Sequence, residues 1–142
     1  MVGAEDPLTT YARASLSAGP HLTPMSTRIL YVEDNALVRE VMCELLVKDQ
    51  REIVSCATAE EALKEFTREP FDVVITDVGL PVMSGVELAR GILKLKPDVP
   101  IILASGYDLN FGIQGWGANV RSIIKPFDSL EIEALMGELL RA

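Results

Sequence analysis

The sequence has little that would suit a membrane or a nucleic acid. No apolar run in its 142 residues approaches the ~20 residues of a membrane-spanning helix, and the N-terminus lacks the cationic start and apolar stretch of a signal peptide. Lys and Arg number 13 against 21 Asp and Glu, a formal net charge of −8, whereas nucleic-acid binding needs a basic face. We therefore expect a cytoplasmic protein without membrane insertion or direct nucleic-acid contact.

Cysteine and histidine are also scarce. Cys43 and Cys56 have neither metal-binding nor redox spacing, so we expect two buried, reduced thiols. The only histidine, His21, lies in a stretch rich in small residues, Gly and Pro that has no sustained apolar period. We expect that stretch, residues 1–27, to be a flexible tail or linker outside the domain.

From residue 28 to residue 142 the chain alternates between strand and helix patterns five times. Apolar runs predict strands at residues 29–32, 53–56, 73–76, 101–104 and 122–124. The second and third runs are continuously apolar, which is typical of parallel strands covered by helices on both faces. The pattern predicts an α/β domain on a doubly wound, five-stranded parallel sheet of flavodoxin-like order 2-1-3-4-5.

Capping signals mark the starts of three helices. Thr58 and Ser84 each stand three residues before a Glu, which is the spacing of a capping box that satisfies the free amides of the first turn. Asp128 is expected to cap the last helix in the same way. The inner face of that helix is predicted to include Leu130, Leu135 and Leu139.

The fourth helix, between the last two strands, has the weakest signal. Glycines fall where the alternation requires this helix, and each costs up to ~1 kcal/mol relative to Ala. They are Gly106, Gly112, Gly115 and Gly117. We expect helix four to be short, irregular or mobile. Trp116 is expected to anchor this stretch as a partly buried side chain, and contact with a partner is the second interpretation.

Four of the predicted strands end on polar residues. Glu33 and Asp34 follow the first strand, Asp77 the third, Ser105 the fourth and Lys125 the fifth. Because the carboxyl ends of parallel strands meet at one edge of the sheet, where such folds bind ligands, we expect these side chains to share one cleft. Each alone has an ordinary explanation as a helix cap, a turn residue or a surface charge, but their joint occurrence favours a site.

The chemistry of these residues suits phosphoryl transfer. Three carboxylates held together repel one another unless a cation lies between them, and oxygen ligands alone favour Mg²⁺. A carboxylate such as Asp77 can attack phosphorus and form an aspartyl phosphate. The Lys125 ammonium, the Ser105 hydroxyl and the metal would then stabilise the phosphoryl oxygens.

Residues 28–142 resemble the receiver domain of two-component response regulators. The matching motifs are Glu33-Asp34, Asp77 with Gly79-Leu80-Pro81 and Met83-Ser84-Gly85, Ser105, and Lys125-Pro126-Phe127. The resemblance implies that a histidine kinase or phosphotransfer protein donates phosphate from a phosphohistidine to Asp77, and that a downstream protein reads the result. It also implies a monomer or weak dimer that catalyses its own phosphorylation and slow dephosphorylation rather than a dedicated enzyme.

The same resemblance assigns the metal ligands. It implies that Asp34, Asp77 and the main-chain carbonyl of Gly79 hold Mg²⁺, with Glu33 acting mostly through water. The Lys125–Pro126 peptide bond is commonly cis in this family. The sequence departs from the family pattern at Ser122, where Tyr or Phe is usual, and in the glycine-rich fourth helix. We therefore expect phosphate to be read out by ordering of residues 106–119 instead of by a rotating ring.

Two other functions stay open on the sequence alone. A phosphatase of the haloacid-dehalogenase type also uses an Asp nucleophile, but it needs a second acid two residues later, where this chain has Gly79. A phosphorylation-independent interaction module could keep the fold with a silent site. The sequence also leaves open whether the chain is a stand-alone regulator or the receiver part of a hybrid kinase.

Overall fold

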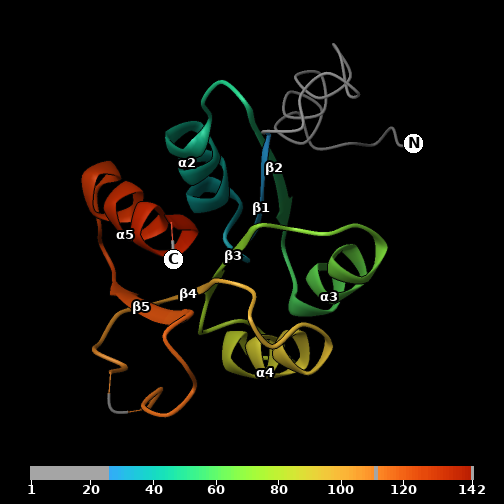
Figure 1. The fold of residues 1–142 in the computed structure, drawn as a ribbon. Coiled ribbons are helices and arrows are strands. Elements are labelled where there is room, and N and C mark those ends of the chain that lie inside the picture. Colours follow the sequence, from blue (N-terminus) through green and yellow to red (C-terminus); the bar gives the residue numbers. More distant parts are fainter. Residues whose placement is uncertain (1–25, 111, 142) are drawn as a thin grey trace.

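The structure is a computed structural model that describes residues 26–110 and 112–141 (Figure 1). The elements are β1 (Thr27–Val32), α2 (Ala36–Leu46), β2 (Arg51–Cys56), α3 (Ala59–Arg68), β3 (Val73–Asp77), α4 (Gly85–Leu95), β4 (Ile101–Ser105), β5 (Val120–Ile124) and α5 (Ser129–Arg141). The predicted tail lies outside the described residues except for its last two positions, and Thr27 already belongs to β1.

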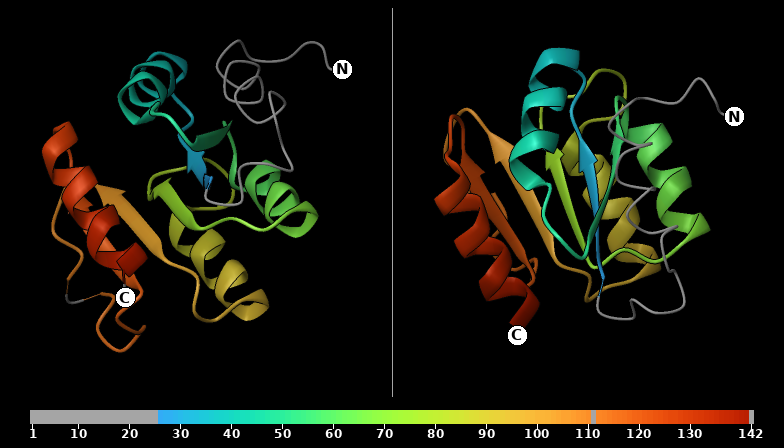
Figure 2. Two further views of the ribbon diagram at one scale, coloured as in Figure 1. Left: turned by 45° about the horizontal axis from the view of Figure 1, so that its top comes forward. Right: turned by 90° about the horizontal axis from the view of Figure 1, so that it is seen from above.

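The strands form one parallel sheet in the order β2-β1-β3-β4-β5, which confirms the predicted topology. Figures 1 and 2 show α2 and α5 on one face of the sheet and α3 and α4 on the other. In register, Asp77 at the end of β3 lies opposite Ala104, and Ser105 lies opposite Ile124. The strand ends that carry the polar residues therefore meet at one edge.

Each face of the sheet has its own apolar core. Along β1, Ile29 and Tyr31 pack with α2 and α5, whereas Leu30 and Val32 pack with α3 and α4. Both faces of the central strands are buried, which explains why their sequences are apolar without a polar alternation. The two cysteines are buried, one in each core, as predicted. None of the described helices has the length and apolarity to cross a bilayer.

Side chains cap the helices largely as predicted. Ser84 and Glu87 exchange the two hydrogen bonds of a capping box at the start of α4. Thr58 accepts the N–H of Glu61, but the Glu61 carboxylate accepts the N–H of Ala57 rather than that of Thr58. Asp128 also caps α5 by accepting the Glu131 N–H at 2.8 Å.

The predicted inner face of α5 is wrong at one position. Leu130 is 79% exposed, whereas Ile132, Met136 and Leu139 are buried. The buried residues follow a spacing of four and three along the helix, and Leu130 falls outside that stripe. Leu135 is partly buried against the same core, and Leu139 is buried as predicted.

The connection between β4 and β5 contains turns and no helix in the residues that are described there, 106–110 and 112–119. This agrees with the weak helix signal. Gly115 and Gly117 have φ angles of 87° and 113°, a left-handed conformation that L side chains disfavour. Leu109, Ile113 and Trp116 nevertheless pack against the core beneath α4, so the connection closes that face without a helix.

Partly buried ion pairs join the sheet to its surroundings. Arg51 at the start of β2 makes two hydrogen bonds, of 2.8 and 2.6 Å, to the Glu133 carboxylate of α5. At the start of β1, Arg28 binds the buried Glu52 carboxylate at 2.6 Å and stacks over the Phe71 ring. Removing the cation from such a pair would leave a buried, unpaired charge.

Glu133 makes the stability of the fold depend on pH. Hydrogen bonds from Arg51 lower the pKa of Glu133 below its ordinary value of 4.5, and they outweigh the opposing effect of burial. A carboxyl with a lowered pKa stabilises the fold above its unfolded pKa, and this contribution is lost as the pH falls through the folded pKa. We expect Glu133→Gln to lower the free energy of unfolding near neutral pH by about 1 kcal/mol.

Urea unfolding measured across the acid range tests this prediction. The variant should lose stability less steeply than wild type below pH 4.5. Glu138→Gln is the matched control, because its ion pair with Arg121 is exposed on both sides and should contribute little. Equal pH dependence in wild type and Glu133→Gln would contradict the assignment.

Candidate functional site

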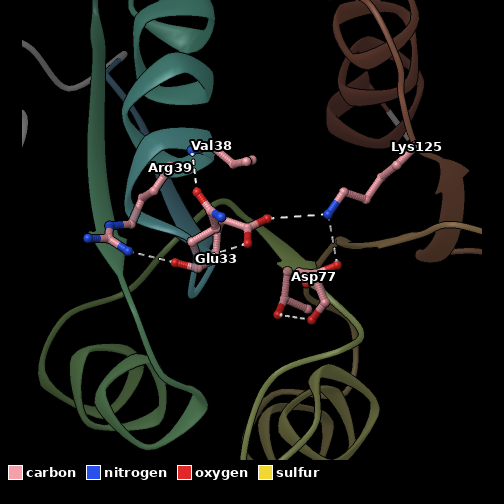
Figure 3. A network of polar contacts seen from close by, with 7 residues as sticks. Glu33, Val38, Arg39, Asp77 and Lys125 are labelled. Atoms are coloured by element: carbon pink, nitrogen blue, oxygen red, sulfur yellow. Dashed lines mark hydrogen bonds and ion pairs between the residues drawn. The ribbon is translucent and has the colours of Figure 1, made fainter.

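The predicted site residues converge at the carboxyl edge of the sheet. Glu33 and Asp34 follow β1 directly, Asp77 ends β3, Ser105 ends β4 and Lys125 follows β5. Figure 3 shows Lys125 reaching across the edge toward Glu33 and Asp77. Glu33 and Lys125 thus come into contact, although they lie 92 positions apart in the chain.

Lys125 lies between two carboxylates. Its ammonium nitrogen is 3.3 Å from Asp77 Oδ1 and 3.4 Å from Glu33 Oε1. Burial alone would lower the pKa of Lys125, but the charges of Asp77 and Glu33 outweigh burial and raise it, so the ammonium form is favoured. The Lys125 N–H donates to the Ser105 carbonyl at 2.7 Å, and the Lys125–Pro126 bond is cis as expected.

Glu33 is the buried member of the acid pair, with 3% of its surface exposed. Its carboxylate accepts the Asn35 N–H at 3.1 Å, and its carbonyl accepts a hydrogen bond from Arg39 Nη1 at 2.8 Å. Burial raises the pKa of Glu33, and the Asp77 charge adds to this, while the Asn35 N–H and Lys125 oppose it. A nearby cation would favour the charged form.

The acidic residues could hold such a cation. Carboxylate oxygens of Glu33, Asp34 and Asp77 lie within 4.8 Å of one another, with Asp34 exposed and Asp77 partly buried. Asn35, rather than Asp34, caps α2 through its bond to Val38, so the Asp34 carboxylate is not needed for the cap. Donors that are all oxygen and partly open to solvent fit Mg²⁺.

Two predicted residues sit beside this cluster. A Cβ added to Gly79 would stand 4.0 Å from Asp77 Oδ2, which places the Gly79 backbone next to the carboxylate. Ser105 is buried, and its hydroxyl accepts the N–H of Tyr107 at 3.2 Å. Among the described residues, no hydrogen bond links the Ser105 hydroxyl to Asp77.

The structure also reveals two supports of the site whose roles the sequence did not show, although Gly85 belongs to a motif named above. A Cβ added to Gly85 would lie only 2.1 Å from the Asp77 carbonyl oxygen, so α4 can begin against the end of β3 only with glycine there. The Gly85 N–H donates to the Val78 carbonyl in the same contact. Arg39 supports the Glu33 backbone from α2 (Figure 3). No sequence signal distinguishes Arg39 from a surface arginine of a helix.

Comparison with known proteins identifies the family. The family model of the response regulator receiver domain matches residues 29–136, so the chain belongs to this family. The chemotaxis protein CheY of Thermotoga maritima is 30% identical over 115 residues, which are 78% of this chain and 96% of CheY. The structure of the response regulator TrrA of the same organism, in complex with Mg²⁺ and BeF, has a TM-score of 0.71 at 34% identity over 80% of this chain and 99% of TrrA.

Other relatives are longer proteins. The two-component response regulator PhoP of Pseudomonas aeruginosa is 33% identical over 116 residues, which are 80% of this chain and 52% of PhoP. The chain spans 18% of the response regulator protein FleR of the same organism. The chain is therefore a receiver domain of the two-component response regulator class, and the similarity does not extend to the remainder of those proteins.

Gly85 offers a test of how the site is positioned. We expect Gly85→Ala to push the start of α4 away from Asp77, to lower the free energy of unfolding by about 2 kcal/mol and to weaken Mg²⁺ binding. Gly91→Ala is the matched control in the same helix, because its added methyl would meet nothing closer than a Leu63 methyl at 3.8 Å. Ala is the better helix former, so this control should keep or gain stability.

Chemical denaturation and magnesium titration followed by NMR measure both effects. The Asp77 amide resonance should broaden or shift with Mg²⁺ in wild type and Gly91→Ala. If Gly85→Ala binds Mg²⁺ as wild type does, the close contact does not position the site.

Proposed function

We propose that this chain is a phosphoacceptor switch in which Asp77 takes phosphate from a phosphohistidine of a partner protein. The single observation that carries this proposal is the Lys125 ammonium held 3.3 Å from Asp77 beside the acidic cluster. The family membership supports the same function. Gly79 stands where a haloacid-dehalogenase-type phosphatase needs its second acid, and nothing in the site favours that enzyme.

The reaction exchanges one bond to phosphorus for another. An Asp77 carboxylate oxygen attacks the phosphorus, the O–P bond forms as the N–P bond to the donor imidazole breaks, and the leaving nitrogen is protonated from solvent. The Lys125 ammonium already faces Asp77. It can therefore stabilise the negative charge on the phosphoryl oxygens while the group is transferred. Attack by water on the acyl phosphate later releases inorganic phosphate and restores the carboxylate.

Mg²⁺ fits the proposal as the cofactor. Asp34, Asp77 and the main-chain carbonyl of Gly79 would hold it, and the buried Glu33 would act mostly through water. When bound, the ion neutralises charge on the carboxylates and on the phosphoryl oxygens. The Ser105 hydroxyl would donate to a phosphoryl oxygen on Asp77 after turning away from Tyr107.

An apolar surface next to the site suits the phosphate donor. A groove of about 600 Å³ runs from Asp77 and Lys125 along α2. Its α2 wall includes Leu37, Val41 and Leu45, which are exposed although they are aliphatic. We infer that a histidine kinase or phosphotransfer protein docks on this wall, since exposed apolar side chains that border a reactive group mark interaction sites. We further propose that the protein is located in the cytoplasm.

Phosphate transfer from acetyl phosphate with Mg²⁺ tests the proposal. We expect wild type to gain one phosphoryl group, detected by intact-protein mass spectrometry, and Asp77→Asn to gain none. Asp98→Asn, an exposed substitution outside the site, should behave as wild type. Lys125→Ala should slow uptake by about 100-fold, because it removes a charge that faces the transferred group. Uptake by Asp77→Asn, or turnover of many phosphate esters by wild type, would overturn the proposal.

The readout of phosphate is predicted to involve residues 106–119. A Ser105 hydroxyl that turns toward phosphate releases the Tyr107 N–H, and the hydrogen bond from Ser122 to Asn110 links the same turn to β5. We expect beryllofluoride with Mg²⁺ to increase amide protection in this segment. Hydrogen exchange measured with α3 as the internal reference checks this, and identical protection in both states would contradict it.

A further inference from the structure

A second groove lies away from the acidic cluster, between α4 and the connection that precedes β5. It has a volume of about 410 Å³ and is lined by Arg90, Leu93, Lys94 and Trp116. Three of these residues lie on one side of α4, and Trp116 comes from the turn-rich connection that replaces the expected helix. Neither Asp77 nor Lys125 contributes to it, so it does not depend on the proposed phosphoacceptor function.

The backbone is shaped to present Trp116 to α4. Gly115 and Gly117 flank it in the left-handed conformation, and a Cβ on Gly117 would meet Asn119 Oδ1 at 2.7 Å. The Asn119 side chain in turn donates to the carbonyls of Pro97 and Val99, at 3.0 and 2.9 Å. These bonds tie the part of the connection that follows Trp116 to the segment after α4.

The groove is cationic on an acidic protein. The Arg90 guanidinium lies over the Trp116 ring, 5.1 Å from its centroid, and Lys94 follows one helical turn later. Neither cation forms an ion pair with a described residue, although most of the charged side chains of the protein are acidic. The nearby Glu87 carboxylate is occupied by the Ser84 N–H of the helix cap.

Ordinary structural roles do not account for this arrangement. A lysine in the last turn interacts favourably with the helix dipole, which explains Lys94 alone. Packing on the core explains why the Trp116 side chain is partly buried. The contact with the Trp116 ring accounts for the position of Arg90, but none of these roles gives either cation a carboxylate partner among the described residues.

We propose that this groove binds an acidic peptide segment of a partner protein. Carboxylates of the segment would pair with Arg90 and Lys94, and an apolar side chain between them would pack on Trp116 and Leu93. Charge complementarity with the two unpaired cations is the argument for this occupant. Two cations on a protein with a net charge of −8 do not provide the extended basic path that a nucleic acid requires.

Selection from a phage library of short random peptides tests the proposal on the full chain. Peptides that bind wild type are depleted on the double variant Arg90→Glu/Lys94→Glu, so that only ligands of this groove remain. We expect the remaining peptides to combine Asp or Glu with an apolar residue. Synthetic copies without Trp should shift the fluorescence of Trp116, which is the only tryptophan of the chain. The same fold in all variants is checked by circular dichroism.

The matched control is Lys64→Glu/Arg141→Glu. These cations are also exposed and without an ion pair among the described residues, they lie outside the groove, and their reversal changes the net charge equally. We expect affinity to fall by about tenfold or more in the groove variant and by less than about twofold in the control. Asp77→Asn should bind as wild type does, which separates this proposal from the phosphoacceptor function.

Three results would overturn the proposal. One is that no peptide survives depletion on the groove variant. Another is that the control loses affinity as strongly as the groove variant, which would show a general charge effect. The third is that an oligothymidylate competes with the peptides with the same dependence on Arg90 and Lys94, which would make the groove a nucleic-acid site.

Discussion

The repulsion among carboxylates at one edge of the sheet is the constraint on which this site depends. The ends of two adjacent strands bring carboxylate oxygens of Glu33, Asp34 and Asp77 within 4.8 Å of one another. Among the described residues, Lys125 is the side chain that forms ion pairs with this cluster. The burial that raises the pKa of Glu33 works against its ionisation. Three carboxylates that face one ammonium would be stabilised by a further cation, which is the property that a metal-assisted phosphoacceptor needs.

Much of this arrangement could be predicted from the sequence, because it follows from the direction of the strands. Apolar runs that end on Asp77, Ser105 and Lys125 place those residues at one edge in any parallel sheet. The alternation of strands and helices is typical of a doubly wound sheet, for which 2-1-3-4-5 is one of the common orders. The capping residues Ser84 and Asp128 were predictable for a similar reason. Their hydrogen bonds are local, and the sequence contains both partners.

What could not be predicted depends on distances between elements. Leu130 is exposed because of the rotation of α5 about its axis on the sheet. The spacing of the apolar residues in this helix fits more than one buried face, so it does not determine that rotation. The need for glycine at Gly85 arises from the approach of α4 to the Asp77 carbonyl, and a capping box predicts the same helix start with or without that contact. Arg39 supports Glu33 across the turn that joins β1 to α2, and a helical arginine gives no sign of such a bond.

The connection between β4 and β5 borders two surfaces of the protein, the acidic edge of the sheet and the groove that contains Trp116. It begins directly after Ser105, which ends β4 at the acidic edge, and its later part presents Trp116 to α4. Hydrogen bonds of Asn119 join the far end to the segment after α4. The near end is joined by the hydrogen bonds of Ser105 with Tyr107 and of Ser122 with Asn110. A change at Ser105 would act directly on the near end, whereas Leu109 and Ile113, which pack on the core, lie between that end and Trp116.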